Sequence, residues 1–362
     1  MVIKDINIEN CCNLLFIIKF ASMFNIVRIE KGLIKFTLLA IIFFNGCRNK
    51  DQPSNKENLS VFDKKLASLN AAINKKTNED SLYLLRGYFF LENEKYEEAI
   101  LDFSYAWKLD SSHPAALHQL AETYLAYFKS YEALQILKEA GKRFPGSAET
   151  WRKLAKLQLI LKQYDDGFKS LEKARNTGDG MPQTAFLTGV FFKEMGDTAR
   201  AINSLQEAIE GDPDIEDAWI ILGQLLEAKG MDLAGRYYET ALQRNPTNKQ
   251  ALLAKANYLI RKDQLQEALM IFKKMQRLDP QNADSFFHAG LIYLDLNAVK
   301  QASEDFQKAV ALNPLLVEAQ YYSGLSSEWL GDKEKAAKYY QTALRLAPDY
   351  KDPREGLIRL NK

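Results

Sequence analysis

Apolar residues recur along most of the chain with the spacing of amphipathic helices, and this pattern itself repeats. From Asp80 onward, a helix-period segment with a small residue near its middle is followed about twelve residues later by a second segment that begins with a small residue. A large apolar residue stands four positions further on, as Phe103 follows Ala99 and Leu137 follows Ala133. Repetition at a period of 34 residues is the signature of stacked helix pairs. The pattern predicts eight pairs over 80–350.

In each block the first helix has a small residue near its middle, and the second helix has a large apolar residue. The packing of the two helices explains this arrangement. A small residue lets two helices approach closely where they cross, and a large apolar residue fills the space beside the crossing. Proline ends a second helix because it cannot continue it. The mid-helix small residues are Gly87, Ala121, Ala155, Gly189, Gly223, Ala256, Gly290 and Gly324. The large residues are Phe103, Leu137, Leu171, Leu205, Tyr238, Phe272, Phe306 and Tyr340.

These blocks resemble the tetratricopeptide repeat over about three quarters of the chain. Trp151 and Trp219 stand where that family often has tryptophan, and Leu222 with Gly223 matches its Leu-Gly pair. The resemblance implies an all-α fold, a right-handed superhelical solenoid of about eight helix–turn–helix repeats with short capping helices. Departures from the pattern are Arg86 and Lys255 in place of leucine and Gln158 in place of an aromatic residue.

Segments on either side of the repeats have the character of caps, which a solenoid needs at its ends. Residues 61–79 carry apolar residues at helical spacing and predict an amino-terminal cap helix, and residues 351–362 predict a short carboxy-terminal one after Pro353. The run 176–180 joins the third and fourth blocks and contains two glycines, which resist helix continuation. It is therefore the expected hinge or kink.

The amino terminus has the pattern of a secretory leader. Lys31 and Lys35 precede the apolar run 36–44, and Gly46-Cys47 follows it. A basic segment, a short apolar stretch and a small residue before the cut form a signal peptide, and this run is shorter than the roughly 20 residues of a spanning helix. Gly46-Cys47 resembles a bacterial lipobox, which implies lipidation of Cys47, although Phe44 and Asn45 depart from the usual residues. The alternative is an uncleaved anchor with a chance cysteine.

The predicted organisation is a leader over 1–46 and a lipid-anchored polar tether over 47–60. Because acidic residues in 1–22 do not suit a leader, we expect the true start at Met23. The residue after the lipidated cysteine is Arg48, not aspartate, and by the enterobacterial sorting rule this implies the outer membrane of a bacterial envelope. Periplasmic and surface-facing orientations both stay open, as does the oligomeric state.

The resemblance also implies a binding face, because in such repeats the first helix of each pair lines a concave groove that holds a peptide or a partner helix. Several residues expected there are apolar or aromatic, which suggests anchors for a partner. The alternative is that some of them pack between adjacent helices. Only Arg152, Lys153 and Lys156 approach the carboxylate clamp of some relatives. The expected groove residues are Tyr88, His118, Arg152, Lys156, Phe186, Phe287, Leu291 and Tyr321.

Charge and motif content argue against several other functions. The net charge is +1, without the basic excess that nucleic-acid binding requires. No metalloprotease, nucleophile-elbow or phosphate-loop motif is present, so we expect neither an enzyme nor a cofactor. His118 and Glu122 share one helix face, and without a third ligand nearby we interpret them as a solvated surface pair and expect no metal site.

Three functional interpretations remain. The first is an envelope scaffold or adaptor that binds protein partners through its groove. The second is a periplasmic chaperone that holds exported polypeptides, which an apolar groove would also suit. The third is a glycan-binding lipoprotein, although the helical glycan receptors that resemble this chain carry a large non-repeat part that is absent here. Crosslinking in cells separates the first two, and glycan binding without a protein partner would favour the third.

Overall fold

The computed structural model describes residues 60–361, and in this range the chain forms eighteen helices and no strand. Eight antiparallel helix pairs follow one another, with one helix before them and one after them. The prediction of an all-α repeat solenoid is therefore confirmed. None of the helices within 60–361 is both long and apolar enough to cross a bilayer.

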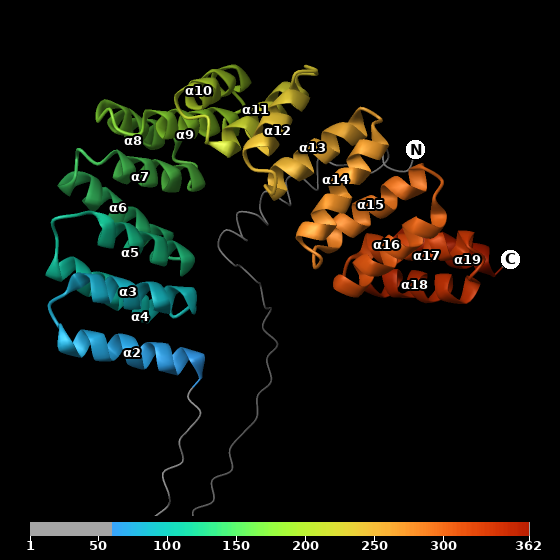
Figure 1. Ribbon diagram of the computed structural model, residues 1–362, viewed down its shortest axis with the longest axis horizontal. Coiled ribbons are helices and arrows are strands. Elements are labelled where there is room, and N and C mark those ends of the chain that lie inside the picture. Colours follow the sequence, from blue (N-terminus) through green and yellow to red (C-terminus); the bar gives the residue numbers. More distant parts are fainter. Residues whose placement is uncertain (1–59, 362) are drawn as a thin grey trace, which may run out of the picture. The chain divides into compact units, whose positions relative to one another are not determined.

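Two compact units divide the chain, with the boundary at Thr177–Gly178, inside the run expected to be a hinge. In that run Gly178 and Gly180 have φ of 74° and 59°, a left-handed conformation that glycine adopts without a steric penalty. The first unit contains α2 (Val61–Lys75), α3 (Asp80–Glu92), α4 (Tyr96–Leu109), α5 (Ala115–Ala126), α6 (Ser130–Arg143), α7 (Ala148–Ile160) and α8 (Tyr164–Asn176) (Figure 1).

The second unit is built in the same way from five further pairs and a last helix. Each helix contacts the next along the chain (Figure 1). Its helices are α9 (Met181–Glu194), α10 (Thr198–Gly211), α11 (Glu216–Ala228), α12 (Ala234–Arg244), α13 (Lys249–Arg261), α14 (Leu265–Leu278), α15 (Ala283–Asp295), α16 (Val299–Leu312), α17 (Val317–Trp329), α18 (Lys333–Leu346) and α19 (Lys351–Leu360).

Each flanking helix packs against the pair beside it. Ser60 and Asp63 form a reciprocal capping box at the start of α2, and α2 contacts α3 through its buried Leu69 and Ile73. α19 contacts both α17 and α18. It begins two residues before Pro353, so this proline lies in the first turn. The N–H groups of a first turn have no partner within the helix, so the N–H that proline lacks costs no helical hydrogen bond.

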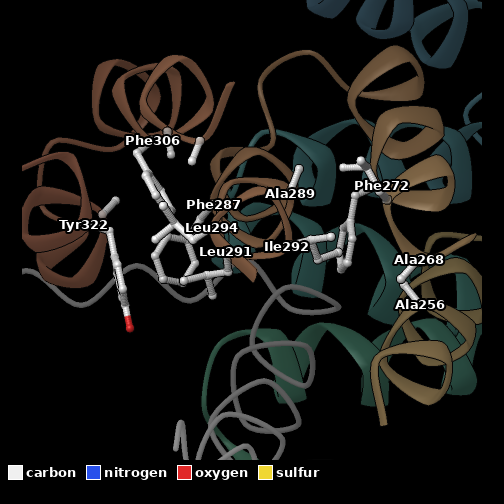
Figure 2. Packing of buried hydrophobic residues seen from close by; sticks show 14 of the residues in the cluster. Ala256, Ala268, Phe272, Phe287, Ala289, Leu291, Ile292, Leu294, Phe306 and Tyr322 are labelled. Atoms are coloured by element: carbon white, nitrogen blue, oxygen red, sulfur yellow. The ribbon is translucent and has the colours of Figure 1, made fainter. Parts of the chain in front are cut away.

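The small and large residues of each block meet as the packing argument requires. A Cβ atom on Gly290 would lie 2.6 Å from the ring of Phe306, closer than real Cβ contacts. Phe306 is fully buried and stacks on Tyr322 with ring centroids 5.4 Å apart (Figure 2). A residue larger than glycine at position 290 would therefore force the Phe306 ring or the two helices α15 and α16 to shift.

Departures from the repeat pattern are compensated by polar partners on the neighbouring helix. Gln158 accepts a hydrogen bond from the Ser170 hydroxyl at 2.7 Å, and both side chains are buried. Lys255 forms an ion pair with Glu239. Because a buried polar group is costly only when it lacks a partner, these substitutions are compatible with the fold.

The turn within each pair closes on one residue with positive φ. Glycine suits this position because it has no Cβ atom, and other residues are strained there. Gly196, Gly230 and Gly331 occupy it in three blocks. In the other five blocks the residues are Glu94, Phe128, Lys162, Asp263 and Asn297.

Candidate functional site

A groove of about 560 Å³ opens in the first unit, between α3, α5 and α7. The carboxy-terminal halves of these three helices supply most of its lining, because the first helices of successive pairs lie side by side. The start of α4 and Leu137 on α6 complete it. The lining residues are Leu91, Glu92, Glu94, Tyr96, His118, Ala121, Glu122, Leu125, Ala126, Leu137, Lys153, Lys156, Leu157 and Ile160.

The groove combines an apolar surface with charged groups at its rim. Leu91, Leu125 and Ile160 are only half-buried, so apolar side-chain atoms face the groove. Glu92 and Glu94 lie at the carboxy-terminal end of α3 and in the turn after it, and both are exposed. Lys156 on α7 is also exposed. None of these three charges forms an ion pair with a residue between 60 and 361. The groove can therefore offer apolar contact together with unpaired charges of both signs.

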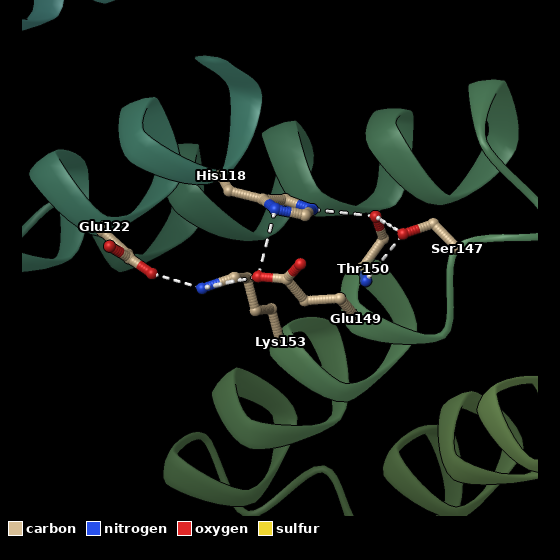
Figure 3. A network of polar contacts seen from close by, with 6 residues as sticks. All are labelled: His118, Glu122, Ser147, Glu149, Thr150 and Lys153. Carbon is tan, nitrogen blue, oxygen red and sulfur yellow. Dashed lines mark hydrogen bonds and ion pairs between the residues drawn. The ribbon is translucent and has the colours of Figure 1, made fainter. Parts of the chain in front are cut away.

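His118 anchors a polar network that joins α5 to α7 on one side of the groove (Figure 3). Its Nε2 lies 2.8 Å from the Thr150 hydroxyl, which in turn donates to Ser147 Oγ at 2.9 Å. Ser147 also accepts a hydrogen bond from the Thr150 backbone and caps the start of α7. The network thus fixes the amino-terminal end of α7 against the first turn of α5.

Lys153 extends the same network toward the solvent. Its Nζ lies 2.6 Å from Glu122 on α5 and 3.6 Å from Glu149 on its own helix (Figure 3). Glu149 lies 3.7 Å from Nδ1 of His118. Because two carboxylates neutralise Lys153, the Lys156 ammonium group is the cation of the groove that remains available to a ligand.

The interpretation of His118 and Glu122 as a solvated surface pair is wrong. His118 is only 3% exposed and contacts Thr150, while Glu122 pairs with Lys153. Burial lowers the pKa of His118 and outweighs the opposing effect of Glu149, so the imidazole is neutral at pH 7. Thr150 is 32 residues away in sequence, and no pattern within α5 could have indicated this contact.

Tyr88 and Arg152 lie on the first helices beside the groove, although neither lines it. Tyr88 is exposed, and its ring packs edge-on against Phe103 at 5.4 Å. Partial burial and the nearby Glu122 raise the pKa of the Tyr88 phenol. Arg152 is half-buried. Of the four residues predicted in this unit, His118 and Lys156 thus line the groove itself.

The predicted groove residues of the second unit are more buried than expected. Phe287 is 9% exposed and Leu291 2%, and both belong to the core cluster around Phe306 (Figure 2). Tyr321 is half-buried, and its ring lies 5.4 Å from that of Tyr350. Phe186 is half-buried against the cluster of α9–α11. For Phe287 and Leu291 the structure favours the alternative interpretation, packing between adjacent helices.

Several groove residues near the turns were not predicted from the sequence. Glu92 ends α3, Glu94 lies in the turn that follows, Tyr96 begins α4, and Ile160 ends α7. Tyr96 stacks on Tyr127 with ring centroids 5.4 Å apart, and the Tyr127 hydroxyl donates to Glu97 at 2.9 Å. The cluster of tyrosines at consecutive turns was a signal that could have identified this end of the groove.

No group of three or more potential metal ligands gathers among residues 60–361. Cys47, the predicted lipidation site, lies outside the described residues. The groove supplies an apolar surface, with carboxylates and the unpaired ammonium group of Lys156 at its rim.

Comparison with known proteins identifies the repeats. Two family models, both described as "Tetratricopeptide repeat", match the chain. One matches residues 192–232, 231–283 and 287–351, and the other matches residues 114–157. Together the two span more than half of the chain.

Individual relatives are distant. Anaphase-promoting complex subunit 7 of Arabidopsis thaliana is 24% identical over 225 residues, or 60% of this chain and 39% of that protein. BBSome complex member BBS4 of Bos taurus is 22% identical over 318 residues, or 78% of this chain and 60% of that protein. The chain thus spans less than two thirds of the length of these relatives.

A solved structure with a similar fold is the C-terminal part of a TPR repeat-containing protein from Cytophaga hutchinsonii. Its TM-score is 0.55 at 19% sequence identity, and the match covers 66% of this chain and 99% of that chain. At this identity the similarity concerns the fold alone.

Proposed function

Because this chain belongs to the tetratricopeptide-repeat family, we propose that it is a protein-binding scaffold whose groove between α3, α5 and α7 holds a segment of a partner polypeptide. The observation that carries this proposal is the groove itself. It has a volume of about 560 Å³, an apolar surface and exposed charges at its rim. Pockets of this kind bury apolar anchors and use a few polar groups to orient a ligand.

Rigidity supports the same function. The network from His118 through Thr150 to Ser147 holds α5 and α7 in one arrangement before a partner arrives. A binding surface that is already ordered loses less conformational freedom when the complex forms. The α5–α7 side of the groove therefore serves as a preformed part of the site.

The proposal is tested by filling the groove. Ala126 lines it near the end of α5, so Ala126→Trp blocks it, whereas Ala115→Trp adds the same side chain at the exposed start of the same helix. A photo-crosslinking amino acid at position 125 is expected to capture a partner in cells, identified by mass spectrometry. Capture should be lost in Ala126→Trp and kept in Ala115→Trp. Equal capture by both variants would exclude the groove as the binding site.

We also propose that the scaffold is anchored in a bacterial envelope, in the outer membrane, through lipid on Cys47. The support is the sequence of the leader and of the polar tether that follows it. Metabolic labelling with an alkyne fatty acid is expected to mark the full-length chain and not Cys47→Ser, which should accumulate at the size of the uncleaved precursor. Equal labelling of both proteins would refute lipidation at this residue.

A chaperone that holds exported polypeptides is the second candidate, and the half-buried Leu91, Leu125 and Ile160 in the groove favour it. The crosslinking experiment separates the two functions. One defined partner at position 125 supports a scaffold, whereas a broad range of unfolded clients supports a chaperone.

A further inference from the structure

Phe128 is the one aromatic residue among the positive-φ turn residues of the described repeats. Its φ is 60°, and it is 69% exposed. An L-residue with a Cβ atom is strained in this conformation, and a bulky side chain is uncommon there. Neither backbone preference nor core packing therefore explains a phenylalanine at this position. Strained residues of this kind are concentrated at functional sites.

The turn that carries Phe128 is rich in aromatic residues. Tyr127 stacks on Tyr96, and the Lys129 ammonium group lies 4.4 Å from the centroid of the Tyr127 ring. Tyr131, at the start of α6, is 70% exposed. Tyr127 is thus held by neighbours within the unit, while the side chains of Phe128 and Tyr131 are directed mostly to solvent.

This turn continues the groove. Leu125 and Ala126 line the groove, and Phe128 follows Ala126 by two residues in the chain. Tyr96, which also lines it, joins the turns 93–95 and 127–129 through its stack on Tyr127. The exposed carboxylates of Glu92 and Glu94 lie at this same end. Negative charge and exposed aromatic surface are therefore neighbours there.

We propose that these two adjoining turns form a recognition edge, defined by Glu92, Glu94, Phe128 and Tyr131, for a basic residue next to a large apolar residue on the partner polypeptide. The basic group would pair with the two glutamates, and the apolar side chain would cover Phe128 and Tyr131. This inference rests on the proposed function, because the rest of the partner segment occupies the groove. Charge complementarity selects a basic residue, since Glu92 and Glu94 have no ion-pair partner between residues 60 and 361.

The Phe128→Gly variant tests whether the Phe128 side chain serves binding or stability. Glycine adopts positive φ without strain, so the midpoint of thermal unfolding should stay equal or rise. Partner binding should weaken about tenfold, as expected for loss of an aromatic anchor. Lys162→Gly, at the same turn position of the next block, is the matched control and should leave binding unchanged. A clear fall in the unfolding midpoint of Phe128→Gly, or unchanged binding, would overturn the proposal.

The chemistry of the partner is tested with four fluorescent peptides in one glycine–serine frame. They differ only in a central pair: arginine–tryptophan, arginine–serine, glutamate–tryptophan and glutamate–serine. Fluorescence anisotropy with the full chain should rank arginine–tryptophan tightest. The double variant Glu92→Gln, Glu94→Gln should remove the preference for arginine, and Phe128→Gly the preference for tryptophan. Any other ranking, or four equal affinities, contradicts the recognition edge.

The two proposals fail in distinguishable ways. If Ala126→Trp abolishes crosslinking at position 125 while Phe128→Gly retains it, the groove binds the partner and the recognition edge is wrong. If Ala126→Trp has no effect, the groove itself is not the binding site.

Discussion

The guanidinium group of Arg86 on α3 donates two hydrogen bonds to the carboxylate of Asp102 on α4, each 2.7 Å long. A third bond of 2.7 Å reaches the side chain of Asn70 on α2. The side chain of Asp102 is 7% exposed and that of Arg86 21%. One arginine, standing where the repeat pattern has leucine, therefore links the flanking helix to the first pair.

Asp102→Ala removes the acceptor of this pair and leaves the Arg86 charge half-buried without it. We expect the free energy of unfolding of the first unit to fall by about 2–4 kcal/mol, because breaking a buried ion pair costs more than the pair contributes. Urea denaturation followed by circular dichroism measures the change. Asp166→Ala, which breaks an exposed pair with Lys169, is the control and should cost less than about 0.5 kcal/mol. Equal effects of both variants would contradict the role of Arg86.

Gly290→Ala introduces a Cβ atom that would lie 2.6 Å from the Phe306 ring, so α15 and α16 must move apart. We expect the second unit to lose about 1–3 kcal/mol of stability. Gly146→Ala is the control, because a Cβ atom there meets nothing within 4 Å. Thermal unfolding should show a lower midpoint for the first variant only. A neutral Gly290→Ala would mean that the crossing is not closely packed.

Acid should destabilise the first unit through His118. Burial lowers its pKa below 6.5 in the folded state, so the unfolded chain binds the proton more readily. The contribution of the neutral imidazole to stability is complete above pH 6.5 and decreases as the pH falls toward the folded-state pKa. Denaturation midpoints measured from pH 7.5 to pH 5 should fall less steeply for His118→Gln than for the unchanged protein. The exposed His113→Gln serves as a substitution control. Identical slopes for His118→Gln and the unchanged protein would exclude this source of acid sensitivity.

Phe287→Ala should act on stability rather than on recognition. The ring packs against Phe306 and Tyr322 at centroid distances of 5.9 Å, and its removal leaves a cavity. We expect a loss of about 3–4 kcal/mol in the free energy of unfolding. A variant with unchanged stability and weakened partner binding would instead restore the prediction that this side chain lines a binding surface.

Much of the fold could be predicted because its determinants lie close together in sequence. The spacing of Gly290 and Phe306 is set within one helix pair, and the structure places them in contact. The site was predicted less completely. His118 and Lys156 line the groove as expected, whereas Glu94 and Tyr96 at the turns were overlooked. Their side chains enter the groove only because successive turns lie beside one another.

By itself, the sequence determined that helices form in pairs and which small and large residues meet at each crossing, since helix periodicity and the 34-residue repeat are local properties of the chain. Only the tertiary structure decided which first-helix residues face solvent. His118 is buried because Thr150 of the next block lies against it. Phe287 is buried because Tyr322 of the next block packs against its ring. Burial in a stacked array depends on neighbouring repeats, and the pattern within one helix carries no information about them.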